Sequence, residues 1–498
     1  MTRTLLLGAR VLDPGGPPGP AAVGIVDGVI TGVGPAAGER GPHVVRLDGA
    51  VITPAFVDAH VHSTATGLLV DGLDLTACPS PHALLDAVAA RAASRPGALI
   101  WGHGWQDQSW AGGAPGRTAL DRAAGGAPMY LSRIDVHSAL ASSALLDRAP
   151  AAVGAAGWSD GALSADAHHH ARRAAVAAVD GPVRDAAQLA FLGDAAARGV
   201  GAVHECAGPD ISSAADLAAL LSRDGPDVVG YWGEAVTTPD AARDLLAATG
   251  AHGLAGDLFV DGSIGSRTAA LTAPYSDAPG CTGNRYLDAD TVAAHVAACT
   301  AAGVQAGFHV IGDAAAAILV DGLRRAGPTG RPTVHHRVEH LEMVDAEQTA
   351  ALAAHGVVAS VQPLFDAYWG GPHGMYVERL GARAHAMNPF AALHAAGVVL
   401  ALGSDSPVTP VGPWEAVRAA VAHRTPGSGL TVTQALAAHT VGGHRAAGDT
   451  DPRAGRLVAG AAASYAVWDG DGSGGVPRCL RTVQRGRILH DTLVSAGR

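Results

Sequence analysis

The amino-acid sequence contains no lysine. All 34 basic side chains among its 498 residues are arginines, and 45 acidic residues give a formal net charge of −11. The arginines are scattered along the chain, whereas binding to nucleic acid or to an anionic membrane surface needs a clustered basic face. We therefore expect neither nucleic acid nor a membrane as a partner.

Paired cysteines and long apolar runs are missing as well. The five cysteines are an odd number without Cys-x-x-Cys spacing, so neither a disulfide framework nor a thiolate zinc site is predicted. The apolar runs stop well short of the roughly 20 residues of a membrane-spanning helix. Near the N-terminus, Gly8 and Arg10 interrupt the apolar stretch before it reaches the length of a signal-peptide core. The simplest expectation is a cytoplasmic protein.

Short apolar runs separated by Gly, Pro and Asp fill both ends of the chain, at residues 4–45 and 455–494. This sequence pattern is typical of β-hairpins. Because the two β-rich ends flank a long middle of different character, we expect them to assemble into one small composite β-domain. Its two parts are predicted at residues 1–50 and 446–498.

The middle of the chain alternates Ala-rich helical stretches with short apolar segments. Parallel strands joined by helical crossovers give this alternation, and eight such segments predict an α/β fold with a (β/α)8 TIM-like barrel over residues 51–445. The long gap after the first segment predicts an insertion at residues 63–190, which could close over the barrel mouth as a lid. The predicted barrel strands are 51–62, 200–207, 227–234, 257–263, 304–313, 334–340, 357–363 and 398–406.

Potential metal ligands end several of these predicted strands. His60 and His62 end the first, and because alternate residues of a strand share a face, both imidazoles face one point. His309, His340 and Asp405 end the fifth, sixth and eighth. Reactive groups of a barrel lie at the carboxyl ends of its strands, so these five side chains should converge at one mouth. By contrast, the run 168–170 in an Ala-rich segment is predicted to be solvated surface.

Three imidazoles and a carboxylate suit a divalent metal, with Zn²⁺ expected, and leave a position for water. The metal would lower the pKa of that water toward ~7. Asp405 would then take the proton as general base. The convergent residues therefore predict a metallohydrolase site for a small-molecule substrate.

Six ordered motifs carry a family resemblance: PAFVDAHVH at 54–62, DGSIGSRTAAL at 261–271, FHVIGDAA at 308–315, RVEHLE at 337–342, LGSDSPV at 402–408 and the insertion segments that begin with WGHGWQDQSW at 101–110. Together they resemble the amidohydrolase superfamily, and in particular its YtcJ-like branch, amidohydrolase family 3. The resemblance implies the barrel, the composite β-domain and metal-dependent hydrolysis of amide or related C–N bonds other than peptide bonds. It also implies His60, His62, His309 and Asp405 as metal ligands, His340 as a ligand or a group that polarises the water, and a possible homodimer.

One departure from the family pattern concerns the metal count. Many members of this branch carry a lysine on the fourth strand that is carboxylated and bridges two metals, and the matching position here is Asp257. Asp257 could bridge two ions itself, or a single ion could be held by His60, His62, His309 and Asp405, with His340 bound to the water. Since an aspartate is several bonds shorter than a carboxylated lysine, the prediction favours one ion.

Further residues are candidates for the substrate pocket. Asp261 and Arg267 follow the fourth predicted strand, and Arg267 could bind a substrate carboxylate or carbonyl or instead pair with Asp261. Three aromatic residues follow the seventh strand and could form either a substrate-facing wall or a packed loop, and one tryptophan of the insertion is a further pocket candidate. These aromatic candidates are Phe365, Tyr368, Trp369 and Trp105.

The sequence thus predicts a metal-dependent amidohydrolase that cleaves an amide, formamide or cyclic amide bond. Asp405 and His340 are its predicted catalytic residues, the first as general base and the second as a group that stabilises the developing oxyanion. A mononuclear deaminase of an aminated heterocycle is the alternative within enzymes. A catalytically silent barrel scaffold is the alternative from another class, against which the full set of rim ligands argues.

Overall fold

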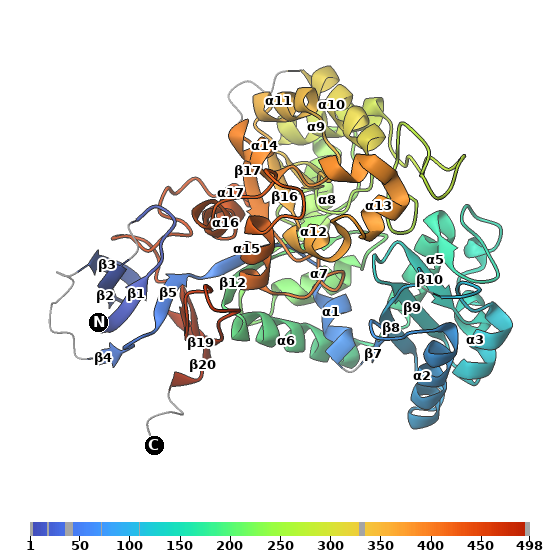
Figure 1. The fold of residues 1–498 in the computed structure, drawn as a ribbon, viewed down its shortest axis with the longest axis horizontal. Coiled ribbons are helices and arrows are strands. Elements are labelled where there is room, and N and C mark those ends of the chain that lie inside the picture. The colour runs from blue at the N-terminus through green and yellow to red at the C-terminus, as the bar shows by residue number, and fades with distance from the viewer. Residues whose placement is uncertain are drawn as a thin grey trace.

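The computed structural model describes residues 3–16, 19–34, 43–70, 72–108, 110–327 and 334–493. Three regions lie side by side in Figure 1: a β-sheet that contains both ends of the described chain, an α/β centre, and a lobe formed by the insertion. The outermost residues of the predicted terminal β-regions, 1–2 and 494–498, lie outside the described residues.

Strands from both ends of the chain form one sheet in the order β20-β19-β18-β5-β1-β2-β3, with β4 beside β1. Its inner face is apolar and includes the fully buried side chains of Leu6, Ile30 and Val467. This sheet therefore has its own hydrophobic core. Its strands are β1 Arg3–Val11, β2 Gly19–Val26, β3 Val29–Gly34, β4 His43–Arg46, β5 Val51–Pro54, β18 Tyr465–Trp468, β19 Cys479–Gln484 and β20 Arg487–Asp491.

The first predicted barrel strand, 51–62, is wrong as a single strand. Its first part is β5, which pairs with β1 and β18 in the terminal sheet, and its second part is β6 (Phe56–Val61), which pairs with β12 in the centre. Pro54 ends β5, since proline has no N–H to donate to a continuing ladder. The chain thus passes from one sheet to the other at Ala55.

Seven parallel strands form the α/β centre, in two sheets with the orders β13-β12-β6 and β14-β15-β16-β17. Isolated bridges join Val61 to Ser406 and Phe259 to His309. The fourth predicted strand, 257–263, is not a regular strand, because its backbone makes single bridges rather than a ladder. The further strands are β12 Val200–Ala207, β13 Asp227–Trp232, β14 Gly307–Val310, β15 Arg337–His340, β16 Val358–Val361 and β17 Val399–Leu402.

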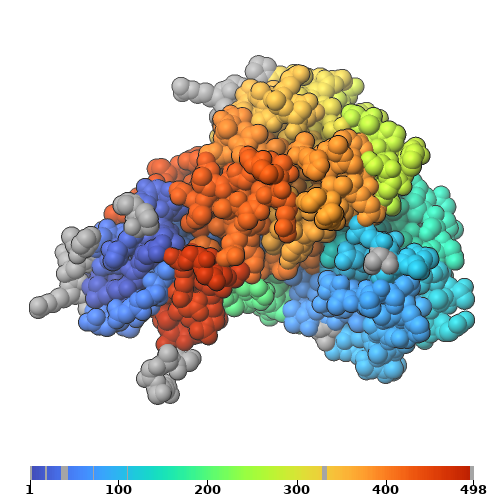
Figure 2. Space-filling view, in the orientation of Figure 1, coloured from blue at the N-terminus to red at the C-terminus, as the bar shows by residue number. Residues whose placement is uncertain are grey.

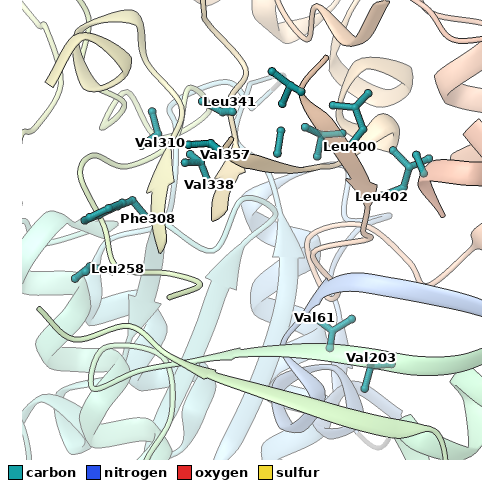
Figure 3. Close-up of a cluster of buried hydrophobic side chains, with 14 of the residues drawn as sticks. Val61, Val203, Leu258, Phe308, Val310, Val338, Leu341, Val357, Leu400 and Leu402 are labelled. Carbon is teal, nitrogen blue, oxygen red and sulfur yellow. The ribbon is translucent and has the colours of Figure 1, made fainter. Parts of the chain in front are cut away.

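Helices cover the outside of these strands, and apolar side chains of helices and strands form one buried cluster. Figure 3 shows part of this cluster, with labelled side chains from β6, β12, β14, β15 and β17. Local sequence sets where they begin: the side chains of Thr238 and Asp288, for example, accept N–H groups of the first turns of α8 and α9. The helices are α6 Gly181–Ala197, α7 Ala214–Leu221, α8 Pro239–Thr249, α9 Ala289–Ala302, α10 Asp313–Ala326, α11 Ala346–Ala354, α12 Pro363–Trp369, α13 Met375–Leu380, α14 Phe390–Ala395, α15 Pro413–Val421, α16 Val432–Ala438 and α17 Val441–Ala446.

The insertion forms a lobe of its own, seen in blue and cyan beside the centre in Figure 2. A five-stranded sheet in the order β11-β10-β9-β8-β7 is its base, and α5 (Ala165–Ala177) follows β11. None of the helices in the described ranges is long and apolar enough to cross a membrane. The other elements of the lobe are α1 Ser63–Val70, β7 Leu73–Asp74, α2 Pro81–Ser94, β8 Ile100–Trp105, α3 Arg117–Ala124, β9 Met129–Arg133, β10 Ser138–Ala141, α4 Ser143–Leu146 and β11 Leu163–Ser164.

Candidate metal centre

Two histidines and two aspartates meet where β6 and β17 end. The His60 Nε2 atom lies 3.5 Å from Asp257 Oδ1 and 3.4 Å from Asp405 Oδ1. The His62 Nε2 atom lies 3.2 Å from Asp257 Oδ2 and 3.0 Å from Asp405 Oδ1. All four side chains are buried. The structure therefore brings together side chains from the first, fourth and eighth predicted strands.

A second group shares Asp257 with the first. The His309 Nδ1 atom lies 3.4 Å from Asp257 Oδ1, and the His340 Nε2 atom lies 3.7 Å from the same oxygen. The ligand atoms of Asp257, His309 and His340 form one compact set, and those of Asp257, His60 and His62 form another. The Asp257 carboxylate thus contacts four imidazoles.

The outward-facing nitrogens of three imidazoles each meet an acceptor. His60 Nδ1 lies 2.9 Å from Glu339 Oε2, and His340 Nδ1 lies 2.8 Å from Gln362 Oε1. His309 Nε2 lies 3.2 Å from the carbonyl oxygen of Gly262. An acceptor at one ring nitrogen places the proton there and leaves the lone pair of the other nitrogen for a metal. These three imidazoles therefore present lone pairs to the cluster.

Several buried polar atoms of the cluster have no hydrogen-bond partner among the described residues: His60 Nε2, Asp257 Oδ1, His309 Nδ1 and Asp405 Oδ1. Buried polar atoms without partners cost free energy, so such a concentration points to a missing ligand. Tetrahedral bonds of about 2.0–2.2 Å would place neighbouring ligand atoms about 3.4 Å apart, close to the separations found here. The donor set fits a divalent metal.

Charge pairing within the cluster is strong. Burial opposes a charge on His62, but its contacts with Asp257 and Asp405 outweigh burial and raise the pKa of this imidazole to about 9. Burial likewise opposes ionisation of both carboxylates, but the charge of His60 and the hydrogen bonds of the surrounding imidazoles together lower the pKa values of Asp257 and Asp405. Protons and a metal ion therefore compete for the same atoms.

Arg337 and Glu339 support the cluster from β15. Their side chains share one face of the strand, and Arg337 donates from Nε to Glu339 Oε1 at 2.6 Å and from Nη2 to Glu339 Oε2 at 3.0 Å. Burial opposes ionisation of Glu339, but the Arg337 charge outweighs burial and lowers the pKa of this carboxyl. An ionised Glu339 holds the His60 ring in place.

The backbone is strained beside two of the candidate ligands. His340 has φ 73°, Leu341 has φ 49° and Asp405 has φ 53°, in the left-handed region that residues with a Cβ rarely adopt. Such conformations cost about 1–3 kcal/mol each and cluster at functional sites. Here they turn the chain at the ends of β15 and β17, where these two side chains enter the cluster.

Two predicted pocket aromatics lie next to the centre. The Phe365 ring is nearly parallel to that of His340, with centroids 6.0 Å apart, and Trp369 packs against Phe365 at 4.9 Å. Tyr368 is 54% exposed and lines a wide cleft of ≈ 1210 Å³ together with Trp369. The aromatic segment is therefore helix α12 rather than a loop, with only part of it near the metal centre.

Three other pocket candidates have different partners. Arg267 donates to Asp277 at 2.6 Å instead of pairing with Asp261 or reaching the centre. Asp261 is fully buried and accepts backbone N–H groups of residues 270, 311 and 312, so it holds the loop together, although burial raises its pKa to about 7. Trp105 is 1% exposed in the core of the insertion and donates to the Leu131 carbonyl. As substrate-binding residues, Arg267, Asp261 and Trp105 are not supported by these contacts.

The prediction of a solvated surface at 168–170 is wrong for two of its residues. His168 and His169 are buried, because α5 turns this face toward the metal centre. The His169 ring stacks on Phe259, and His137 lies 5.2 Å from the His309 ring. One small cavity is lined by these histidines, by Arg172 and by Asp257, His309, His340 and Asp405.

Sequence reasoning missed Arg172 altogether. The residue lies one helical turn after His168, so helical spacing could have grouped the two on one face. That spacing does not show which way the face points, because the Ala-rich helix has no strongly apolar stripe to mark its buried side.

Comparisons with known proteins agree with the motifs. The profile described as the amidohydrolase family matches residues 43–490, so the chain belongs to that family and is a hydrolase. The resemblance to the YtcJ-like branch is also confirmed, because the chain is 27% identical over 440 residues to the Bacillus subtilis (strain 168) protein named YtcJ, covering 81% of this chain and 80% of the relative.

Two further relatives span most of the chain. Protein LONG AFTER FAR-RED 3 of Arabidopsis thaliana is 27% identical over 475 residues, which cover 85% of this chain and 80% of that protein. The crystal structure of an uncharacterized metal-dependent hydrolase from Pyrococcus horikoshii superposes with a TM-score of 0.74 at 23% identity, covering 98% of this chain and 100% of that chain. This likeness supports the α/β fold.

Proposed function

We propose that the protein hydrolyses a C–N bond of the amide, formamide or cyclic amide type in a small molecule, with a divalent metal, Zn²⁺ being the simplest choice. The observation that carries the proposal is the convergence of four histidines and two aspartates, in which one inward-facing atom each of His60, His309, Asp257 and Asp405 lacks a hydrogen-bond partner within the described chain. We also propose that the two central sheets and the bridged segment 251–263 close into a (β/α)8 barrel, with residues 51–445 as the barrel domain apart from β5, which pairs in the terminal sheet.

The residues present would hold two ions rather than the single ion that the sequence favours. His60, His62, Asp257 and Asp405 form one set of donors, and His309, His340 and Asp257 form the second. The sequence favours one ion because aspartate is too short to bridge two ions in place of a carboxylated lysine. This holds only if the fourth strand is regular. Because this segment is not in a ladder, its backbone is free to bring Asp257 within 3.7 Å of all four imidazoles.

When bound, the metal supplies Lewis-acid activation of water and of the scissile carbonyl. Asp405 takes the proton of the attacking water and passes it to the leaving nitrogen. Its carboxylate is ionised near neutral pH, because neighbouring imidazole charge lowers its pKa in spite of burial. Glu339, Gln362 and the Gly262 carbonyl hold three imidazoles in place. Phe365 and Trp369 shield the His340 side from water.

Location and assembly remain predictions from the sequence. We propose a cytoplasmic enzyme that acts on small molecules rather than on nucleic acids or membranes, and a homodimer as its assembly. We also propose residues 1–50 and 446–498 as the two parts of the composite β-domain and residues 63–190 as the lid.

The test is turnover of a substrate panel by metal-loaded protein. The panel contains N-acyl and N-formyl amines and amino acids, cyclic imides, aminopurines and a dipeptide, and Asp405→Asn serves as the inactive reference. Hydrolysis of an amide by wild type, with loss in the variant, supports the proposal. Ammonia release with retention of a heterocyclic ring would identify the deaminase alternative instead, and no turnover of any compound by metal-loaded wild type would favour the silent scaffold.

A further inference from the structure

One buried arginine next to the metal centre has no partner. Arg172 on α5 is 5% exposed, and within the described ranges it forms no ion pair and no hydrogen bond. Its neighbour Arg173 pairs with Asp210. The other buried arginines of the described chain each pair with a carboxylate: Arg133 with Asp135, Arg337 with Glu339, Arg379 with Asp277 and Arg481 with Asp491.

The imidazole rings beside Arg172 are uncharged and do not balance its positive charge. Burial, together with neighbouring positive charge, lowers the pKa of His168 well below its usual value, and burial also lowers that of His169. Both rings are therefore neutral near pH 7.

The carboxylates that line the same small cavity as Arg172 have other partners, since Asp210 pairs with Arg173, and Asp257 and Asp405 contact the imidazoles of the metal centre. A buried guanidinium without a carboxylate in contact is costly, so Arg172 points to an anion that arrives from outside the protein.

Arg172 borders two cavities. It lines the small cavity that contains Asp257, His309, His340 and Asp405, and it also lines a larger cavity of ≈ 390 Å³ that reaches His62. A molecule in the larger cavity can therefore contact His62 and Arg172 at the same time. The guanidinium is positioned to bind one end of a substrate whose other end is at the metal centre.

The rest of the larger cavity indicates what that substrate carries. Much of its wall is apolar, with Leu68, Trp101 and Ile211 among its side chains. Two acidic side chains also line it, but they have donors from the protein itself: Glu205 accepts the Ser63 N–H at 2.8 Å, and Asp216 accepts the Thr64 hydroxyl at 2.9 Å.

We infer that Arg172 binds a carboxylate of the substrate, and that the substrate is an N-acyl amino acid with an apolar side chain. The inference rests on the proposed amide hydrolysis. A planar guanidinium matches a carboxylate through two parallel hydrogen bonds. Three arginines line the larger cavity, but Arg173 pairs with Asp210 and Arg184 with Asp185. Arg172 is therefore the one left to balance a negative charge from the ligand, and a dianion such as phosphate would need a second unpaired cation. The apolar wall accommodates the side chain.

The experiment compares N-acetylphenylalanine with N-acetylphenylalaninamide, which differ only in the carboxylate. We expect metal-loaded wild type to hydrolyse the acid with a kcat/KM at least about 100-fold above that of the carboxamide. Arg172→Gln should lower kcat/KM for the acid by about 100-fold and leave the carboxamide within about threefold of wild type, while Arg172→Lys should retain part of the preference. Arg243→Gln is the matched control, because it removes one exposed, paired arginine outside both cavities and should behave as wild type.

The outcomes separate the two proposals. Equal turnover of acid and carboxamide by wild type, or an unchanged preference in Arg172→Gln, overturns the carboxylate site and leaves amide hydrolysis standing. If neither compound is hydrolysed, amide hydrolysis fails for this class, and calorimetry with N-acetylphenylalanine then tests Arg172 alone. Binding to wild type that is lost in Arg172→Gln supports the carboxylate site, whereas equal binding or none contradicts it. Thermal unfolding of the two Arg172 variants verifies that they are folded.

Discussion

The metal centre and the terminal β-sheet bury their polar groups in opposite ways. In the terminal sheet, backbone groups pair along ladders, and the side chains between the layers are apolar, as Leu6, Ile30 and Val467 are. In the metal centre, imidazole and carboxylate atoms are buried without partners, and the backbone at His340 and Asp405 is strained. The sheet is therefore built for stability, whereas the unpartnered polar atoms and strained backbone of the centre lower stability and favour binding of a ligand.

The largest expected effect is on catalysis in the centre. Asp405→Asn removes the proposed base and one charge of the donor set, and we expect kcat/KM to fall by about 10³-fold or more. The measurement is steady-state kinetics with the best substrate of the panel. The exposed Asp240→Asn is the control and should leave kcat/KM within about twofold. An Asp405→Asn enzyme with near wild-type activity would exclude this residue as the base.

The next largest effect is expected on the free energy of unfolding, from a substitution in the terminal sheet. Leu6 is fully buried, so Leu6→Ala should lower the free energy of unfolding by about 2–5 kcal/mol through lost burial and a cavity. Metal content and kcat/KM of the folded protein should stay as in wild type. Denaturant unfolding with metal analysis checks this, and Leu7→Ala, at a half-buried neighbour, should cost less. A loss of metal in Leu6→Ala would show that the two regions are coupled.

A smaller effect, on metal affinity, is expected for a residue that orients a proposed ligand but is not itself one of the proposed ligands. Glu339→Gln leaves His60 with a weaker acceptor at Nδ1, and we expect metal affinity to fall by about 10–100-fold. Competition with a chelator of known affinity measures the change. The exposed Glu347→Gln should retain wild-type affinity. Equal affinities of all three proteins would show that Glu339 does not orient the ligand.

The smallest effect is expected at a loop beside the centre. Arg267 pairs with Asp277 at a partly exposed position, so Arg267→Gln should cost no more than about 1 kcal/mol of stability. Activity should remain within about twofold of wild type. A large rise in KM with unchanged stability would instead restore Arg267 as a substrate-binding residue.

Much of the candidate centre follows from the sequence, because strand periodicity and strand ends are local signals. The ligand candidates lie in one cluster because each is at, or within three residues of, the carboxyl end of a parallel strand. They are His60, His62, His309, His340 and Asp405. What could not be derived depends on tertiary contacts. Asp257 reaches all four imidazoles because its segment leaves the ladder pattern, and hydrophobic spacing does not encode that departure.

The fold shows the same division between local and tertiary signals. Alternating strands and helices predicted the α/β centre, yet the split between β5 and β6 depends on which sheet each half pairs with. Likewise, the Ala-rich helix α5 was identifiable as a helix, but only its packing shows that His169 and Arg172 face the centre. For Trp105, too, only the packing shows its surroundings, because this residue lies in the separate hydrophobic core of the insertion.

We propose that the histidines and aspartates form one metal centre whose two halves share Asp257. Anomalous diffraction from crystals of zinc-loaded protein, recorded on both sides of the zinc absorption edge, tests it most directly. We expect two peaks that both lie in contact with Asp257. One should lie among His60, His62 and Asp405, and the other between His309 and His340. No peak in this cluster, or a single ion that Asp257 does not touch, would contradict it.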